Sequence, residues 1–130
     1  MIMYKTITTN IMVDSVKESM EFYEKKLGFT PVVTVPNESE DFNFAIIVKD
    51  DISIMFQSKE SLEEEYPSLQ TDLIKPAFTL FITVDDVKEL YEELKGNVEV
   101  VKELHQTFYG KDEFAVFDNN HNILTISSHE

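Results

Sequence analysis

Thr8 to Glu21 reads TTNIMVDSVKESME, and Thr79 to Glu92 reads TLFITVDDVKELYE. When the first stretch is shifted by 71 positions onto the second, eight of the fourteen positions are identical and no gap is needed. A repeat of this kind indicates that the chain is built from two similar structural units. A solenoid needs at least three stacked units, so two copies indicate a duplicated half-domain whose halves share one core.

Each copy begins with a pattern that predicts a strand. Ile11 and Val13 fall on one face of the first copy, and Leu80, Ile82 and Val84 on one face of the second. A period of two residues is typical of a half-buried strand. The opposite faces carry Thr8, Asn10 and Met12 in the first copy, and Thr79, Phe81 and Thr83 in the second.

A helix start follows each predicted strand. Ser15 with Glu18, and Asp86 with Glu89, have the spacing of a capping box, in which side chains satisfy the first N–H groups of a helix. Apolar residues then recur at helical spacing. We expect the helices to end at Gly28 and Gly96, each in the left-handed conformation that favours glycine.

The remaining chain predicts three further strands after each helix. They span 30–35, 42–48 and 52–57 in the first half, and 98–103, 113–118 and 123–127 in the second. The chain therefore predicts a single domain over 1–130, with one module at about 1–58, a connection at 59–76, and a second module at about 77–130. Within the connection, Ser61 is expected to cap a short helix that Pro67 ends, and the acidic residues Glu60, Glu63, Glu64 and Glu65 are expected to form a solvated face.

The composition bounds the partners. The chain of 130 residues has 11 Lys and Arg against 25 Asp and Glu, a net charge of −14. That charge argues against nucleic acid and against an anionic membrane surface, and it favours cationic small molecules or basic partners; solubility alone would also explain it. There is no cysteine, which excludes disulfides and thiolate sites. No apolar run reaches transmembrane length, and the first residues, MIMYKTIT, predict a strand rather than a signal peptide, so a cytoplasmic protein is expected.

Two motifs resemble the vicinal oxygen chelate superfamily, which includes glyoxalase I, bleomycin-resistance proteins and extradiol dioxygenases. One is VDSVKESMEFYEKKLGF at 13–29, and the other is FYGKDEFAVFDNNHNILTI at 108–126. The resemblance implies an α+β fold of two tandem β-α-β-β-β modules, whose sheets curl into an open cup that holds a small ligand.

The resemblance also implies where a metal would be bound. Metal-dependent members place four ligands on the first and last strands of each module, and these positions correspond here to Thr8, Met55, Thr79 and Thr125. Hydroxyls and a thioether are poor ligands for Zn, Ni, Mn or Fe. Sliding each strand by two residues brings in only one suitable ligand type, Gln57. We therefore expect no metal and no cofactor.

The expected cup face carries neutral polar and apolar side chains, as small-molecule sites often do. It holds no evident acid, base or nucleophile, and the same residues would also serve to pack the barrel. Phe108 and Tyr109, in a loop predicted between Glu103 and Glu113, would either stack on a planar ligand or cover the end of a strand. The residues predicted to bind ligand are Thr8, Asn10, Met12, Ser53, Met55, Gln57, Thr79, Phe81, Phe108, Tyr109 and Thr125.

The three histidines differ in context. His121 falls in a tight turn, where a positive φ is expected. His105 opens the predicted loop and is either a surface residue or the best candidate for a proton carrier. His129 lies in a C-terminal tail that is expected to be disordered.

Three functions fit these observations. The first is a metal-independent, homodimeric binding protein similar to the bleomycin-resistance branch, which sequesters a cationic or aromatic compound. The second is a lyase, isomerase or dioxygenase that either has a displaced metal site, which uses Gln57, His105 or an acid such as Glu103, or works by a metal-free mechanism. The third is a structural or regulatory dimer whose acidic surface meets a basic partner.

Overall fold

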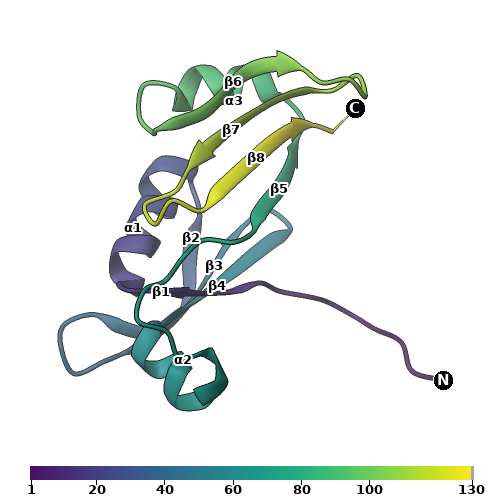
Figure 1. The fold of residues 1–130 in the computed structure, drawn as a ribbon. Helices are drawn as coiled ribbons and strands as arrows, with labels where there is room; N and C mark the ends of the chain where they lie inside the picture. The colour runs from purple at the N-terminus through teal and green to yellow at the C-terminus, as the bar shows by residue number, and fades with distance from the viewer. Residues whose placement is uncertain (130) are drawn as a thin grey trace. The chain divides into compact units, whose positions relative to one another are not determined.

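The structure is a computed structural model that describes residues 1–129. The chain divides into two compact units, Met1–Ile74 and Lys75–Glu130. Each unit has one four-stranded mixed sheet and buried apolar side chains of its own (Figure 1). None of the helices within residues 1–129 is long and apolar enough to cross a membrane.

The first unit has its strands in the order β1-β4-β3-β2 (Figure 1). β1 pairs with β4 in parallel, whereas β2, β3 and β4 pair antiparallel in sequence order. The chain leaves β4 directly into a second helix. The elements are β1 (Asn10–Val13), α1 (Val16–Leu27), β2 (Thr30–Pro36), β3 (Phe42–Lys49), β4 (Ile52–Ser58), α2 (Lys59–Glu65) and a 3-10 turn, η1 (Pro67–Leu69).

The core of the first unit lies between α1 and one face of this sheet. Tyr23, in the middle of α1, is completely buried, and its ring packs edge-on against Phe56 at 5.2 Å and Phe29 at 5.6 Å between centroids. Ala45 lies opposite Phe56 in the register, and Ile47 opposite Ile54, so these four side chains share one face. The opposite face of the sheet is therefore left for other contacts.

The second unit repeats this arrangement with β5 (Thr79–Val84), α3 (Val87–Leu94), β6 (Val100–Gln106), β7 (Asp112–Phe117) and β8 (Ile123–Ser128). Its strand order is β5-β8-β7-β6, and β5 pairs with β8 in parallel. α3 packs on the face that carries Phe114, whose ring lies 5.1 Å from that of Tyr91. Val116, Leu124 and Ile126 are buried on the same face.

The predicted α+β fold of two β-α-β-β-β modules is confirmed. The sequence repeat explains why the two modules begin alike. The two main helices begin at Val16 and Val87, which correspond under the same shift as the repeat. Both caps form as predicted: Ser15 Oγ accepts from the Glu18 N–H at 3.1 Å, and Asp86 Oδ1 accepts from the Glu89 N–H at 3.0 Å. Equivalent sequence therefore makes equivalent strand–helix units.

Two predicted helix ends differ from the structure. Gly28 has the expected left-handed φ of 80°, but Gly96 does not, because α3 ends at Leu94, its C-cap Lys95 has a right-handed conformation, and the chain continues as turns. In the connection, Ser58 rather than Ser61 caps the short helix, since Ser58 Oγ accepts from the Ser61 N–H at 3.2 Å. α2 therefore starts without any linker after β4.

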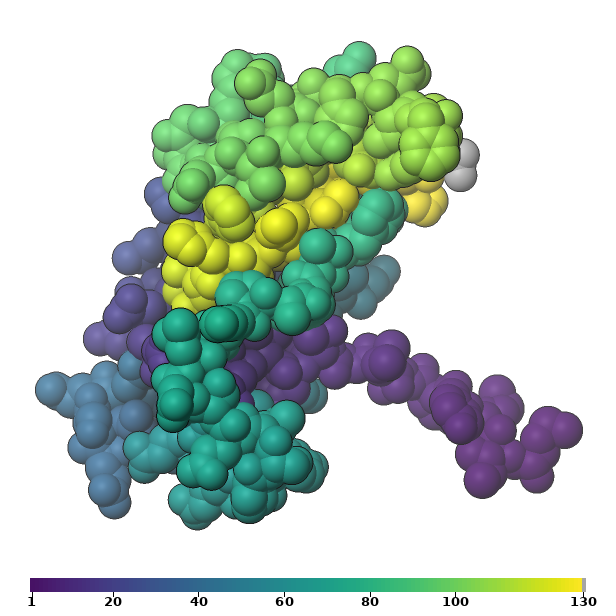
Figure 2. All heavy atoms as spheres, viewed as in Figure 1, coloured from purple at the N-terminus to yellow at the C-terminus, as the bar shows by residue number. Residues whose placement is uncertain are grey.

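The prediction of a strand over the first residues is wrong. In residues 1–129 the first ladder begins at Asn10, and only the Thr9 carbonyl extends it, accepting from the Met55 N–H at 2.9 Å. The preceding segment projects from β1 as an arm (Figures 1 and 2). Its apolar side chains Met1, Ile2, Met3, Tyr4 and Ile7 are exposed.

Candidate functional site

Most of the predicted ligand-binding residues of the first unit share one face of its sheet. Asn10 lies opposite Met55 and Met12 opposite Gln57, while Phe56 between them faces α1. Ser53 belongs to the same set, two residues before Met55 on β4. Thr8 lies outside this set, because β1 begins two residues after it.

The predicted ligand-binding residues that lie on strands of the second unit also share a face of their own sheet. Thr79 and Phe81 lie opposite Ile123 and Thr125, on the side away from α3. Phe81 is exposed. The structure thus groups these residues within each unit, and their role in ligand binding stays a prediction.

The four positions at which the resemblance predicts metal ligands carry side chains that do not suit a metal. Thr8, Met55, Thr79 and Thr125 offer hydroxyls and a thioether, which do not fit Zn, Ni, Mn or Fe. Gln57, the one suitable type nearby, already forms hydrogen bonds through both its amide oxygen and its amide nitrogen. Its Oε1 accepts from Asn10 Nδ2 at 2.9 Å, and its Nε2 donates to Ser61 Oγ and Glu65 Oε1, both at 3.0 Å.

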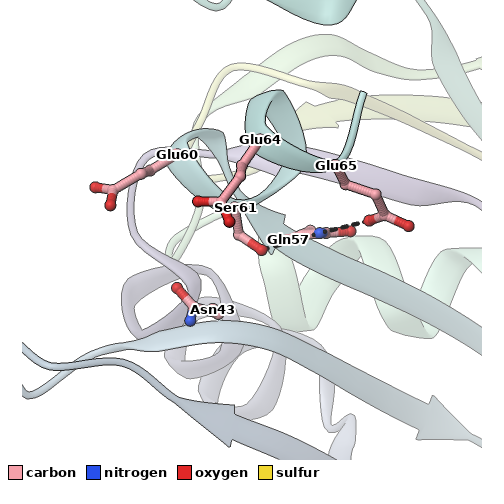
Figure 3. Close-up of a pocket in the computed structure, with 6 residues that line it drawn as sticks. All are labelled: Asn43, Gln57, Glu60, Ser61, Glu64 and Glu65. Carbon is pink, nitrogen blue, oxygen red and sulfur yellow. Dashed lines mark hydrogen bonds between the residues drawn. The ribbon is translucent and has the colours of Figure 1, made fainter. Parts of the chain in front are cut away.

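Gln57 instead forms part of a pocket where β4 runs into α2 (Figure 3). The side chain is 8% exposed and points from the sheet toward α2, which holds it through Ser61 and Glu65. Residues four apart lie on the same side of a helix, which aligns Glu60 with Glu64 and Ser61 with Glu65. The cavity is about 310 Å³ and is lined by Asn43, Gln57, Glu60, Ser61, Glu64 and Glu65.

The pocket is anionic. Three of its six lining residues are glutamates and none is a lysine, arginine or histidine. Within residues 1–129 these glutamates form no ion pair. The neighbouring Lys59 pairs instead with Glu63 at 3.0 Å, and Glu63 does not line the pocket. Like charges this close repel one another, so the pocket favours a cation.

Sequence reasoning missed this pocket. Glu60, Glu64 and Glu65 were expected to form a solvated face, and they are indeed exposed. The available signal was the spacing of four residues between Glu60 and Glu64 and between Ser61 and Glu65, together with Ser58 as the cap, which brings α2 directly beside Gln57. With Ser61 as the predicted cap, the helix would begin three residues further along the chain, and its contacts with Gln57 were not foreseen.

A second polar site lies in the loop between β6 and β7. Phe108 is completely exposed and therefore does not cover a strand end, and its ring packs edge-on against Tyr109 at 5.0 Å between centroids. The Tyr109 hydroxyl donates a hydrogen bond to Glu113 Oε1. This bond, together with desolvation and the carboxylate charge, raises the pKa of Tyr109, which remains a phenol and a donor.

Two of the three histidines differ from the predictions. His105 lies within β6 rather than in the loop, because irregular pairing extends that strand to Gln106. His129 is held rather than disordered, since its N–H donates to the Val84 carbonyl at 2.9 Å and its carbonyl accepts from Lys111 Nζ at 3.2 Å. His121 has the expected positive φ of 63°.

The family model described as "Glyoxalase/Bleomycin resistance protein/Dioxygenase superfamily" matches residues 6–126. The chain belongs to this superfamily. No protein with a curated description matches the sequence. The assignment of this glyoxalase-superfamily chain therefore rests on the family model, and the fold agrees with it.

Solved structures share the fold at low sequence identity. A glyoxalase/bleomycin resistance protein/dioxygenase family enzyme from Burkholderia phytofirmans PsJN has a TM-score of 0.76 and 19% identity, over 93% of this chain and 95% of that one. TioX from Micromonospora sp. ML1 has a TM-score of 0.74 and 11% identity, over 98% and 100%. Lactoylglutathione lyase from Agrobacterium tumefaciens has a TM-score of 0.74 and 12% identity, over 96% and 93%.

Proposed function

We propose that this protein is a metal-independent small-molecule binding protein of the glyoxalase/bleomycin-resistance type that takes a cationic ligand. The acid-lined pocket beside Gln57 carries this proposal. Its volume of about 310 Å³ lies at the lower end of the range for ligand pockets, so the ligand is small. The net charge of −14 adds a long-range attraction for cations.

The chemistry of the pocket selects for ammonium or guanidinium groups. A hydrogen bond to a charged group contributes roughly 1.5–3 kcal/mol, and the exposure of Glu60 and Glu64 reduces this through solvent screening. Two such contacts would give a ligand with two positive groups a clear advantage over one with none. We further propose a homodimer in the cytoplasm, on the ground of family membership and the absence of cysteine.

The binding proposal is tested by calorimetric titration with 1,4-diaminobutane, with the isosteric but neutral 1,4-butanediol as control. The diamine should bind and the diol should not. Glu64→Gln should weaken the diamine about three- to tenfold, because it removes one charged acceptor from the pocket. Glu38→Gln removes the same charge from an exposed loop outside the pocket and should leave the affinity unchanged. Equal effects of the two variants would overturn the pocket assignment.

The proposal that the protein binds its ligand without a metal is tested separately. The protein is incubated with Zn, Ni, Mn and Fe, desalted, and its metal content is measured by elemental mass spectrometry. A ratio near zero per chain is expected from Thr8, Met55, Thr79 and Thr125. A ratio near one would favour the alternative, a lyase, isomerase or dioxygenase with a displaced metal site, and glyoxalase and ring-cleavage assays would follow.

A further inference from the structure

The arm that precedes β1 has the composition of a strand but no strand to pair with in its own unit. Residues 1–9, MIMYKTITT, are rich in the β-branched and aromatic residues that favour strands. Asn10 lies level with Met55 in the parallel pairing of β1 with β4, so Ile7 lies level with Ile52, where β4 begins. Residues 1–6 therefore extend past the end of the sheet, as the projecting arm shows (Figures 1 and 2).

The arm is apolar, exposed and cationic. Five of its side chains are large and hydrophobic, and Tyr4 and Ile7 are 95% and 99% exposed. A contiguous apolar surface of this kind marks an interaction site. Lys5 is the only charged residue among the first thirteen, in a chain with a net charge of −14. The arm is thus complementary in charge to the rest of the chain, and a second copy presents the same acidic surface.

β2 offers an unprotected edge at the other side of the same sheet. It is the outermost strand, and no strand among residues 1–129 pairs with its outer side. Edge strands are usually protected by charged side chains. β6, the outermost strand of the second unit, carries a lysine and a glutamate, whereas β2 carries no charge and exposes Val32, Val33 and Val35. Prolines near the two ends of β2 leave its middle as the part that can pair.

The arm cannot pair with β2 of its own chain without crossing a face of the sheet. The strand order β1-β4-β3-β2 puts the root of the arm at one edge and β2 at the other. Neighbouring strands lie about 4.8 Å apart, so the crossing covers roughly 14 Å and leaves the backbone of the arm without partners. A second copy presents the same edge without this crossing. When two copies exchange their arms reciprocally, the contacts close as a two-fold dimer.

We infer that residues 1–9 form an intermolecular strand along the outer edge of β2 in a second copy of this chain. Main-chain hydrogen bonds then join the two segments, and the apolar side chains of the arm cover the exposed valines of β2. The inference rests on the homodimer of the proposed function and states which segments hold it together. The pocket at Gln57 takes no part, because it lies within the first unit.

Sedimentation velocity over a series of protein concentrations measures the dissociation constant of the dimer. Ile7→Asp should raise this constant at least about tenfold, because it removes an apolar side chain from two symmetric contacts. Tyr4→Ser is a second variant of the same design. Both side chains are exposed in the single chain, so the melting temperature of the monomer should not change. Lys5→Glu should raise the constant about threefold or more, and this effect should shrink in about 1 M salt.

Two matched variants test the choice of β2 as the docking edge. Val32 and Val101 are both exposed valines of outermost strands, at residues that the strand pairing skips. Val32→Lys puts a charge on the edge of β2 and should raise the dissociation constant at least about tenfold. Val101→Lys does the same to β6 and should leave it unchanged. Equal effects of the two variants would overturn the assignment to β2.

Hydrogen exchange followed by ¹H–¹⁵N NMR locates the contact. Amides within 2–8 and within 32–35 should exchange more slowly in the wild-type dimer than in Ile7→Asp. A dimer that forms equally well in Ile7→Asp and Tyr4→Ser would refute the role of the arm and leave the homodimer standing. A wild-type chain that is monomeric at every concentration would refute both. If the diamine fails to bind while Ile7→Asp dissociates the dimer, the proposed pocket is refuted and this inference stands.

Discussion

Replacement of Asp41 by Asn should expose an uneven support of the two repeated helices. Asp41 Oδ2 accepts from Ser15 Oγ at 2.7 Å, and its Oδ1 accepts from the N–H groups of Lys17 at 2.8 Å and Phe42 at 2.6 Å. It thereby fastens the loop before β3 to the first turn of α1. In the second unit Asp86 caps α3 directly, without such a partner among the described residues.

The expected loss is about 1–2 kcal/mol. Asn keeps one acceptor oxygen instead of two, so at least one of the three hydrogen bonds is lost and the others lose their charge, at roughly 1 kcal/mol each. The carboxylate also interacts favourably with the N-terminus of α1, by about 0.3–1 kcal/mol. Because Asp41 is half-exposed, solvent screening reduces the sum.

The pH dependence gives a second check. Burial by itself raises the pKa of Asp41, but the hydrogen bonds from Ser15, Lys17 and Phe42 and the charge of Lys17 outweigh it, so the pKa lies below the ordinary 3.8. A lowered pKa in the folded state means that the stabilisation is present above the ordinary pKa. It is lost as the pH falls through the folded value.

Urea unfolding at pH 7 and at about pH 2–3 measures both effects. Asp41→Asn should be less stable than the wild type at pH 7, and the difference should shrink at the acidic pH. Asp86→Asn serves as the matched control and should cost only about 0.3–1 kcal/mol, because Asn caps nearly as well as Asp. Equal losses in the two variants, or a difference that does not change with pH, would refute the reasoning.

Three further predictions concern stability, measured by thermal and urea unfolding. Gly28→Ala should cost roughly 1–2 kcal/mol, because φ is 80° there, whereas Gly96→Ala should be neutral or stabilise by about 0.4–1 kcal/mol; a reversed order would contradict the two backbone assignments. Asp118→Ala should cost about 2–3 kcal/mol, since this buried carboxylate accepts from the Asn122 N–H and Nδ2 at 2.9 and 3.0 Å, and a loss under about 0.5 kcal/mol would show these bonds to be unimportant. Gln57→Ala should cost about 2 kcal/mol and also weaken diamine binding, and an effect on neither would separate Gln57 from the pocket.

The strand–helix repeat was predictable because each local signal agreed with the others. Alternation at Ile11 and Val13, the Ser15 cap and the Gly28 stop all describe the same unit, and the structure contains it. The face shared by Met55 and the residues opposite it followed from the two-residue period of strands.

The pocket and the position of His105 were not predicted, because both depend on small irregularities. A shift of the helix cap from Ser61 to Ser58 moves α2 beside Gln57. Irregular pairing of β6 keeps His105 in the sheet, where a loop was expected. The hydrogen-bond competition that fixes such details involves residues distant in sequence, and local propensity carries no information about it.

The parallel pairing of the first strand in each unit also bears on how the chain folds. Strands β2 to β4, and β6 to β8, are sequential hairpins and can form from neighbouring residues. β1 and β5 must wait, since Asn10 meets Met55 and Thr79 meets Ile123 only after the intervening chain has become ordered. Closing such long loops is slow compared with closing hairpins. Each unit should therefore pass through a stage in which three strands are paired and the repeated segment, which identifies the fold in the sequence, is the last to join.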